Sequence, residues 1–205
     1  MNLKYKLYTL AGITALSVTT LLGGCGMNMN TNTNQTENAA ETASYPLAVG
    51  DVMTIDDLVG NAKLLDIQDS LTSRGLYYAA WGIGNAEDYV NDEGTTIQLY
   101  DAQLYTIIST CTQDYEALDT CANWESTAKK SYTITDESKL DYNGITFDML
   151  SYTYPEDSKN PCDYGMSIYG ADGTTAICVE ISCRNQWDGD GEDLIKDFLD
   201  HCHLK

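Results

Sequence analysis

The sequence has few basic side chains and few histidines. Lysine and arginine together number 11, against 31 aspartate and glutamate residues, and the two histidines, His201 and His203, stand at the C-terminal end. A chain this acidic repels the phosphates of nucleic acid and of anionic lipid headgroups, so a nucleic-acid-binding role is excluded. The acidic residues are dispersed along the chain, which favours a solvated acidic surface over a dedicated ligand patch.

Common catalytic motifs are also absent. The sequence has no His-Glu-x-x-His, Gly-x-Ser-x-Gly, Walker or dinucleotide-binding glycine motif. A serine or cysteine nucleophile would have to take its histidine from the end of the chain. We therefore expect no cofactor and no catalysis. The alternative to a non-catalytic protein is an exported hydrolase that uses a pair of Asp and Glu carboxylates.

The N-terminus has the layout of a secretory signal peptide. Lys4 and Lys6 form a short cationic region, and residues 7–22 carry no charge. Five threonine and serine residues dilute this apolar run, which falls short of the roughly 20 strongly apolar residues that span a bilayer. The segment therefore predicts export from the cytoplasm.

The tetrapeptide Leu22-Gly23-Gly24-Cys25 resembles the lipobox of bacterial lipoproteins. In that family a diacylglyceryl group is attached to the cysteine sulfur, and the signal is cut before this cysteine. The resemblance implies a mature protein that begins at Cys25 and is lipid-anchored at the extracytoplasmic face of the cell membrane. An ordinary cleaved signal, or an uncleaved helix with a chance cysteine, is the alternative.

Three segments follow from this reading: a signal peptide over 1–24, a lipidated cysteine with a tether over 25–45, and one folded domain over 46–205. The tether is a polar, low-complexity run rich in Asn and Thr, which cannot bury enough apolar surface to fold. Roughly 20 such residues span about 25 Å. Without the two lysines of the signal peptide, 31 acidic and 9 basic side chains give the mature chain a charge of −22, which favours a soluble monomer.

The domain is expected to combine strands with helices. The patterns predict strands over 76–84, 95–110 and 131–135, hairpins over 140–154 (on an Asn143-Gly144 turn) and 161–185, and helices over 112–129 and 192–202. A capping box at Thr54 indicates a further helix through Leu64. A change of apolar parity within the long strand predicts a bulge near Asp101.

Both longer helices show an apolar stripe. The expected buried residues are Tyr115, Leu118, Cys121 and Ala122 in the first helix and Ile195, Phe198, Leu199 and Cys202 in the second. Thr112 is expected to cap the first helix, and Asp190 or Gly191 the second.

The hairpin over 161–185 predicts a specific register. An Asp172-Gly173 type I′ turn would pair Ala171 with Thr174 and would place Cys162 opposite Cys183. Apolar parity on both arms supports this, since a slip of one residue would invert the faces. A four-residue loop is the alternative, and it would offset the two cysteines by two residues.

Six cysteines lie in the domain: Cys111, Cys121, Cys162, Cys178, Cys183 and Cys202. Six allow fifteen complete pairings. The hairpin register favours a Cys162–Cys183 disulfide, because cross-strand Cβ atoms lie within bridging reach. The alternative is reduced core cysteines. The sequence contains no Cys-x-x-Cys motif, so neither a thioredoxin-like site nor a zinc ribbon is indicated.

Other patterns have plainer explanations than a ligand site. We expect no metal at His201-Cys202-His203, because helical residues two apart face different directions. Asp188–Glu192 resembles the start of a calcium loop, but Asp193 stands where an EF-hand requires glycine, so a turn and helix cap are favoured. Some aromatic residues could stack on sugars or peptides, although aromatic residues more often form the core. They are Tyr77, Tyr78, Trp81, Trp124 and Trp187.

The order of elements predicts an α+β fold, with a single mainly antiparallel sheet and helices packed on it. Over residues 76–203 this order resembles, at fold level, the α/β/α sandwich of the PsbP family. Small domains of that type are usually binding or assembly modules, and the resemblance implies the same here. We expect a binding module for an extracellular protein, peptide or glycan. The alternative is an accessory subunit of an envelope complex.

Replacing Cys25 with serine tests the lipid anchor. We expect the Cys25→Ser chain, expressed in a bacterium fed labelled palmitate, to carry no label and to leave the membrane fraction, because two acyl chains are what makes anchoring stable. Unchanged processing and unchanged membrane association of this variant would show that the lipobox reading is wrong.

Overall fold

The computed structural model describes residues 45–58, 62–68, 75–90, 94, 96–155, 158 and 160–205. The predicted signal peptide, Cys25 and almost all of the predicted tether lie outside these residues. Within them, no helix combines the length and the apolar character that crossing a membrane would require.

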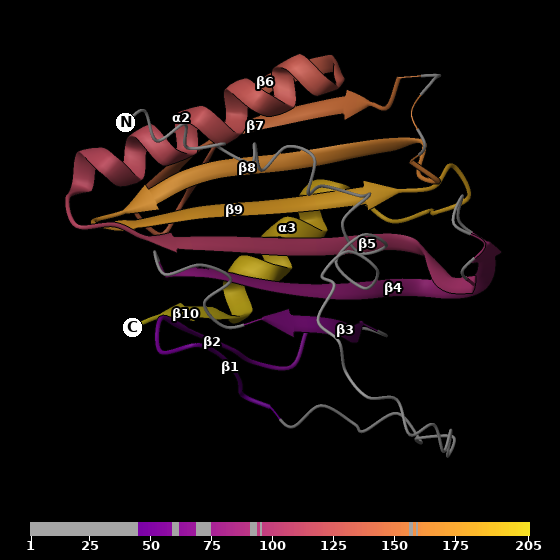
Figure 1. The fold of residues 1–205 in the computed structure, drawn as a ribbon, viewed down its shortest axis with the longest axis horizontal. Coiled ribbons are helices and arrows are strands. Elements are labelled where there is room, and N and C mark those ends of the chain that lie inside the picture. The colour runs from indigo at the N-terminus through magenta and orange to yellow at the C-terminus, as the bar shows by residue number, and fades with distance from the viewer. Residues whose placement is uncertain are drawn as a thin grey trace, which may run out of the picture.

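Ten strands form two antiparallel sheets (Figure 1). The larger has the order β3-β4-β5-β9-β8-β7-β6 and the smaller the order β1-β2-β10. The larger sheet consists of β3 (Lys63–Gln68), β4 (Leu76–Val90), β5 (Thr96–Thr110), β6 (Thr133–Tyr142), β7 (Ile145–Thr153), β8 (Tyr164–Asp172) and β9 (Thr175–Cys183). The smaller consists of β1 (Leu47–Val49), β2 (Met53–Ile55) and β10 (Cys202–Leu204).

Two helices of the described part of the chain complete the layers. α2 (Asp114–Ser131) lies along β8 and β9 on one face, and α3 (Gly191–His201) crosses β9 and β8 on the other (Figure 1). The expected α+β fold with helices packed on an antiparallel sheet is confirmed. The small second sheet, which the sequence did not indicate, lies with α3 on the same side of the large sheet.

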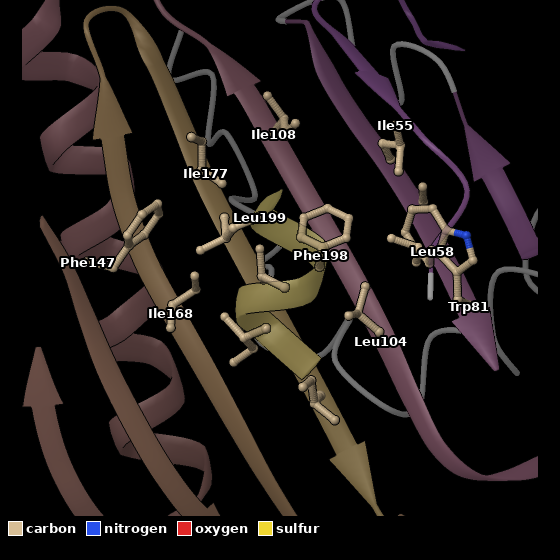
Figure 2. Close-up of a cluster of buried hydrophobic side chains, with 14 of the residues drawn as sticks. Ile55, Leu58, Trp81, Leu104, Ile108, Phe147, Ile168, Ile177, Phe198 and Leu199 are labelled. Carbon is tan, nitrogen blue, oxygen red and sulfur yellow. The ribbon is translucent and has the colours of Figure 1, made fainter. Parts of the chain in front are cut away.

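The main core lies between α3 and the large sheet. Figure 2 shows Phe198 and Leu199 of α3 among isoleucine and leucine side chains of β5, β8 and β9. Trp81 of β4 is fully buried, and its ring lies 5.7 Å from that of Phe198. The predicted stripe of α3 is confirmed at these positions, and Asp190 caps the helix by accepting hydrogen bonds from two backbone N–H groups. Cys202 differs, because it begins β10.

A bulge interrupts the regular pairing of the long strands β4 and β5. Ile83 pairs with Ala102 and Ala86 with Tyr100, so two residues of β4 face Asp101 alone. The Asp101 carboxylate accepts hydrogen bonds from the backbone and the side chain of Asn85, at 2.7 and 2.9 Å. The bulge therefore lies at the predicted place, although β4 contributes the extra residue. Beyond the bulge, β4 continues to Val90, past its predicted end.

The buried face of α2 differs from the prediction. Tyr115 and Leu118 are 63% and 60% exposed, and the buried residues are Ala117, Cys121 and Ala128. The sheet face under this helix carries large tyrosine side chains. Because those rings fill the space between the layers, the helix contacts the sheet through its small residues. The helix also starts later than predicted, with Gln113 as its N-cap.

Of the two predicted hairpins, one has the expected turn and register and the other does not. The Asn143-Gly144 turn is confirmed, since Tyr142 pairs with Ile145 and both turn residues have positive φ. In the second hairpin Asp172 pairs with Thr175, so the turn is Gly173-Thr174 and the predicted register is wrong by two residues. Glycine at the first central position suits a type II′ turn. A shift of two keeps every side chain on its expected face, so apolar parity could not detect it.

The helix predicted from Thr54 to Leu64 is wrong. Its first residues lie in β2 and its last in β3, and residues 59–61 lie outside the described part of the chain. β2 pairs with β1 and with β10 from the far end of the chain. A partner so distant in sequence leaves no local signal. The predicted strand over 131–135 is the beginning of β6, which continues to Tyr142.

The same substitution at a buried and at an exposed leucine tests which faces of α3 and α2 are buried. We expect Leu199→Ala to lower the free energy of unfolding by about 2–5 kcal/mol, because it leaves a cavity in the main core. Leu118→Ala on the exposed face of α2 should change it by no more than about 0.5 kcal/mol. Urea denaturation of both full-length variants measures the difference. Equal losses would mean that Leu118 is buried.

Candidate functional site

A single glutamate lies buried on the sheet face that α2 covers. Glu180 stands in the middle of β9, paired with Ser167 of β8 on one side and with Tyr105 of β5 on the other. Its exposed fraction is 2%. Glutamate is almost never buried this deeply without a partner, because removing a carboxylate from water is costly. The site is built around this side chain.

Neither carboxylate oxygen of Glu180 has a hydrogen-bond partner within the described part of the chain. The nearest hydroxyl groups are engaged elsewhere. Ser167 donates to the Tyr169 hydroxyl at 2.8 Å, and Tyr105 donates to the Gln103 side-chain oxygen. The hydroxyls of Tyr154 and Ser182 bond to each other at 2.7 Å. These hydroxyls therefore donate nothing to the carboxylate, and Tyr152 is the remaining neighbour whose hydroxyl acts on it.

Six tyrosines surround Glu180, and its charge acts on each of them. With Glu180 they form what we term the Glu180 cluster: Tyr78, Tyr105, Tyr132, Tyr152, Tyr154 and Tyr169. The rings of Tyr132 and Tyr152 stack at 4.3 Å, and Tyr154 packs edge-on against both, at 5.2 and 5.7 Å. The Tyr78 and Tyr105 rings lie 6.4 Å apart.

Two hydroxyl groups of this cluster also have no partner among the described residues. They belong to Tyr78 and Tyr152, both nearly fully buried. Gly165 explains the position of the Tyr152 ring. A Cβ at this glycine would lie 2.5 Å from the ring, so only glycine lets the tyrosine lie flat across β8 toward β9.

Burial controls the electrostatics of the cluster. Desolvation raises the pKa of Glu180 from 4.5 to about 8, and the nearby Tyr152 hydroxyl opposes part of this shift. That hydroxyl lies close enough to influence the carboxylate but outside hydrogen-bond geometry. Burial also raises the pKa values of the six tyrosines, which therefore stay neutral. Glu180 is thus a carboxylate that gains or loses its charge near neutral pH.

All six cysteines within the described residues are free thiols in the structure. Cys162 and Cys183 are both buried, but Cys183 pairs with Tyr164, and Cys162 precedes β8. The observed register therefore does not place these two cysteines opposite each other, while a disulfide between them stays a prediction. Burial raises the pKa values of both thiols to about 12, so neither is a reactive thiolate.

The other candidate positions have structural roles. His201 Nδ1 lies 2.7 Å from the Asp197 carbonyl oxygen, and His203 Nε2 lies 3.0 Å from the Asp56 carboxylate. Asp190 caps α3. Across the described ranges, no group of three or more His, Cys, Asp and Glu is placed to hold a metal ion. Trp81 is fully buried in the main core, so it offers no surface for stacking on a sugar.

Sequence reasoning did not single out Glu180. The signal was present in the strand Ile177-Cys178-Val179-Glu180-Ile181, where one ionisable residue interrupts an apolar run. Strands buried on both faces read as nearly continuous apolar runs. A charged residue inside such a run is therefore a candidate functional residue.

No protein-family model matches the chain, and no curated protein sequence is similar to it. One solved structure with a similar fold is that of cyanobacterial PsbP (CyanoP) from Synechocystis sp. PCC 6803. The two share 15% sequence identity over 72% of this chain and 95% of that chain, with a TM-score of 0.38. At this TM-score we take no ligand, partner or residue role from that protein.

The raised pKa of Glu180 predicts a loss of stability with rising pH. Between about pH 4.5 and pH 8 the unfolded chain releases this proton while the folded chain keeps it, so the free energy of unfolding falls with a slope on the order of 1 kcal/mol per pH unit. Glu180→Gln removes this contribution. Urea denaturation from pH 5 to pH 8 should show the wild type losing stability relative to Glu180→Gln.

The matched control for this measurement is Asp172→Asn, which makes the same carboxylate-to-amide change at the exposed end of the same hairpin. This variant should keep the pH dependence of the wild type. A wild type and a Glu180→Gln chain with parallel pH profiles would show that Glu180 titrates normally.

Proposed function

We propose that this chain is a non-catalytic binding module, held by a lipid on Cys25 at the extracytoplasmic face of a cell membrane. The sequence around Cys25 supports the location. The observation that carries the binding role is the Glu180 cluster, in which buried polar atoms have no partner among the described residues and aromatic rings surround them. Native interiors rarely leave such atoms unsatisfied unless they serve a ligand or another function.

The arrangement favours binding over hydrolysis. Glycoside hydrolysis needs two carboxylates about 5–10 Å apart, one ionised and one protonated. Burial is the main influence on the pKa of Glu180, and Tyr152 is the one neighbouring side chain that acts on it among the described residues. A lone buried carboxylate with phenol neighbours can hold a positive charge or a proton. It does not supply the acid and base pair of a hydrolase.

An accessory subunit of an envelope complex is the second candidate. Tyr115 and Leu118 favour it, because they are large apolar side chains exposed on one side of α2. Aromatic and aliphatic anchors of this kind are typical of protein interfaces. Co-purification of one stoichiometric membrane partner, lost in a Tyr115→Ser, Leu118→Ser variant, would favour this second role.

A ligand screen with two variants tests the binding role. The melting temperature of the detergent-solubilised full chain is measured with small amines, carboxylic acids, oligosaccharides and short peptides. We expect at least one class to raise the melting temperature of the wild type and of Asp172→Asn but not that of Glu180→Gln, because bound ligand stabilises the native state. Mass spectrometry should recover that ligand unchanged. Turnover of the ligand, or the absence of any stabilising class, would contradict a non-catalytic binding site here.

A further inference from the structure

Four oxygen atoms of the Glu180 cluster need a hydrogen-bond partner that the described residues do not provide. They are the two carboxylate oxygens of Glu180 and the hydroxyl oxygens of Tyr78 and Tyr152. The charge of Glu180 acts on both tyrosines, so the four atoms belong to one region. Isolated unsatisfied atoms occur in native proteins, whereas four in one region are a pattern that a bound group would satisfy.

The chemistry of this region selects a cation. An ionised carboxylate attracts positive charge, and tyrosine rings attract cations through their negative faces. The chain as a whole carries a formal charge of −20, which raises the local concentration of cations and lowers that of anions. An anionic ligand would meet repulsion from Glu180 and from the surrounding surface.

The ionised carboxylate lacks hydrogen-bond donors, and each neutral phenol oxygen can accept a hydrogen bond as well, which narrows the choice among cations. A primary ammonium group carries three N–H donors, whereas a quaternary ammonium carries none and would leave the four oxygens unsatisfied. A metal ion is disfavoured, because the described part of the chain groups no three His, Cys, Asp or Glu residues around it. We propose that the Glu180 cluster binds a primary alkylammonium group, such as that of a lysine side chain or of a free amine. This inference rests on the proposed binding role and names its ligand class.

The tyrosines also indicate the route from solvent. Tyr132 and Tyr154 are partly exposed, whereas Tyr152 is 1% exposed, and the three rings pack on one another. The alkyl chain of the ligand would lie along the partly exposed rings, with its ammonium group at Glu180. An apolar path that ends at a charged atom suits an amine with a flexible carbon chain.

Binding of the ammonium group is coupled to a proton. The ammonium pairs with ionised Glu180, and the burial that raises the pKa of this carboxyl to about 8 leaves most of it protonated at pH 7. The other ionisable groups acting on the cluster are the six tyrosines, Cys162 and Cys178, with Asp66 acting on Tyr78 and Glu125 of α2 acting on Tyr169. The phenols and these thiols have raised pKa values and stay neutral. Ligand affinity should therefore rise with pH as Glu180 ionises.

Calorimetric titration of the detergent-solubilised full chain with n-butylammonium tests the proposal. We expect the affinity to rise about tenfold from pH 7 to pH 9, following the ionised fraction of Glu180. Glu180→Gln should weaken binding at least tenfold, and Tyr152→Phe, which keeps the ring, should weaken it about fivefold to tenfold. Asp172→Asn should bind as the wild type does. Tyr152→Phe also keeps the test decisive if Glu180→Gln fails to fold.

Three further probes identify the ligand class and its source. Tetramethylammonium should bind at least tenfold more weakly than n-butylammonium, and n-butanol should not bind. N-acetyl-lysine methylamide binding at least tenfold tighter than n-butylammonium would point to a peptide, and equal binding to a free amine. Equal affinity for tetramethylammonium, or binding unaffected by both Glu180→Gln and Tyr152→Phe, would overturn the proposal. An oligosaccharide that stabilises the wild type but not Glu180→Gln would overturn it too, while leaving the binding role intact.

Discussion

Strand β9 is the element on which the rest of the structure depends. It lies in the middle of the seven-stranded sheet, and nearly all of its residues are buried. Its odd-numbered residues from Ile177 to Cys183 pack in the main core with α3, and its even-numbered residues face the layer under α2. Each of the two layers is therefore built against one side of the same strand. A change in this strand affects both layers, because packed interiors transmit strain.

The two layers differ in chemistry. The layer with α3 is aliphatic and closed by Trp81 and Phe198, which is the composition of an ordinary hydrophobic core. The layer with α2 is rich in tyrosine and encloses Glu180. A helix that contacts the sheet through small residues, with Ala117 and Cys121 buried, leaves the tyrosine rings to fill the space. The aromatic layer thus supplies both the packing of α2 and the surroundings of the buried carboxylate.

A buried carboxylate without a partner lowers stability once it ionises, and a well-packed apolar residue would avoid this cost. Packing alone therefore does not account for a carboxylate between Tyr105 and Ser167, which the proposed binding role would explain. The same burial that raises the pKa of Glu180 strengthens its attraction for a cation, because the surroundings screen charge weakly. Burial of Glu180 therefore both lowers the stability of the folded chain and strengthens the proposed attraction for a cation, a combination that is common where proteins bind charged ligands.

The sequence by itself determined the elements whose signals are local. The Asn143-Gly144 hairpin, the capped and amphipathic α3, and the strand–helix order of an α+β fold were all predicted, because turn chemistry and periodicity act over a few residues. It could not determine the Gly173-Thr174 turn, the pairing of β2 with β10, or the exposed face of α2. These depend on which segments meet in space. Tertiary structure also decided the candidate site, because Glu180 is one acidic residue among 31 until the tyrosines of four other strands surround it.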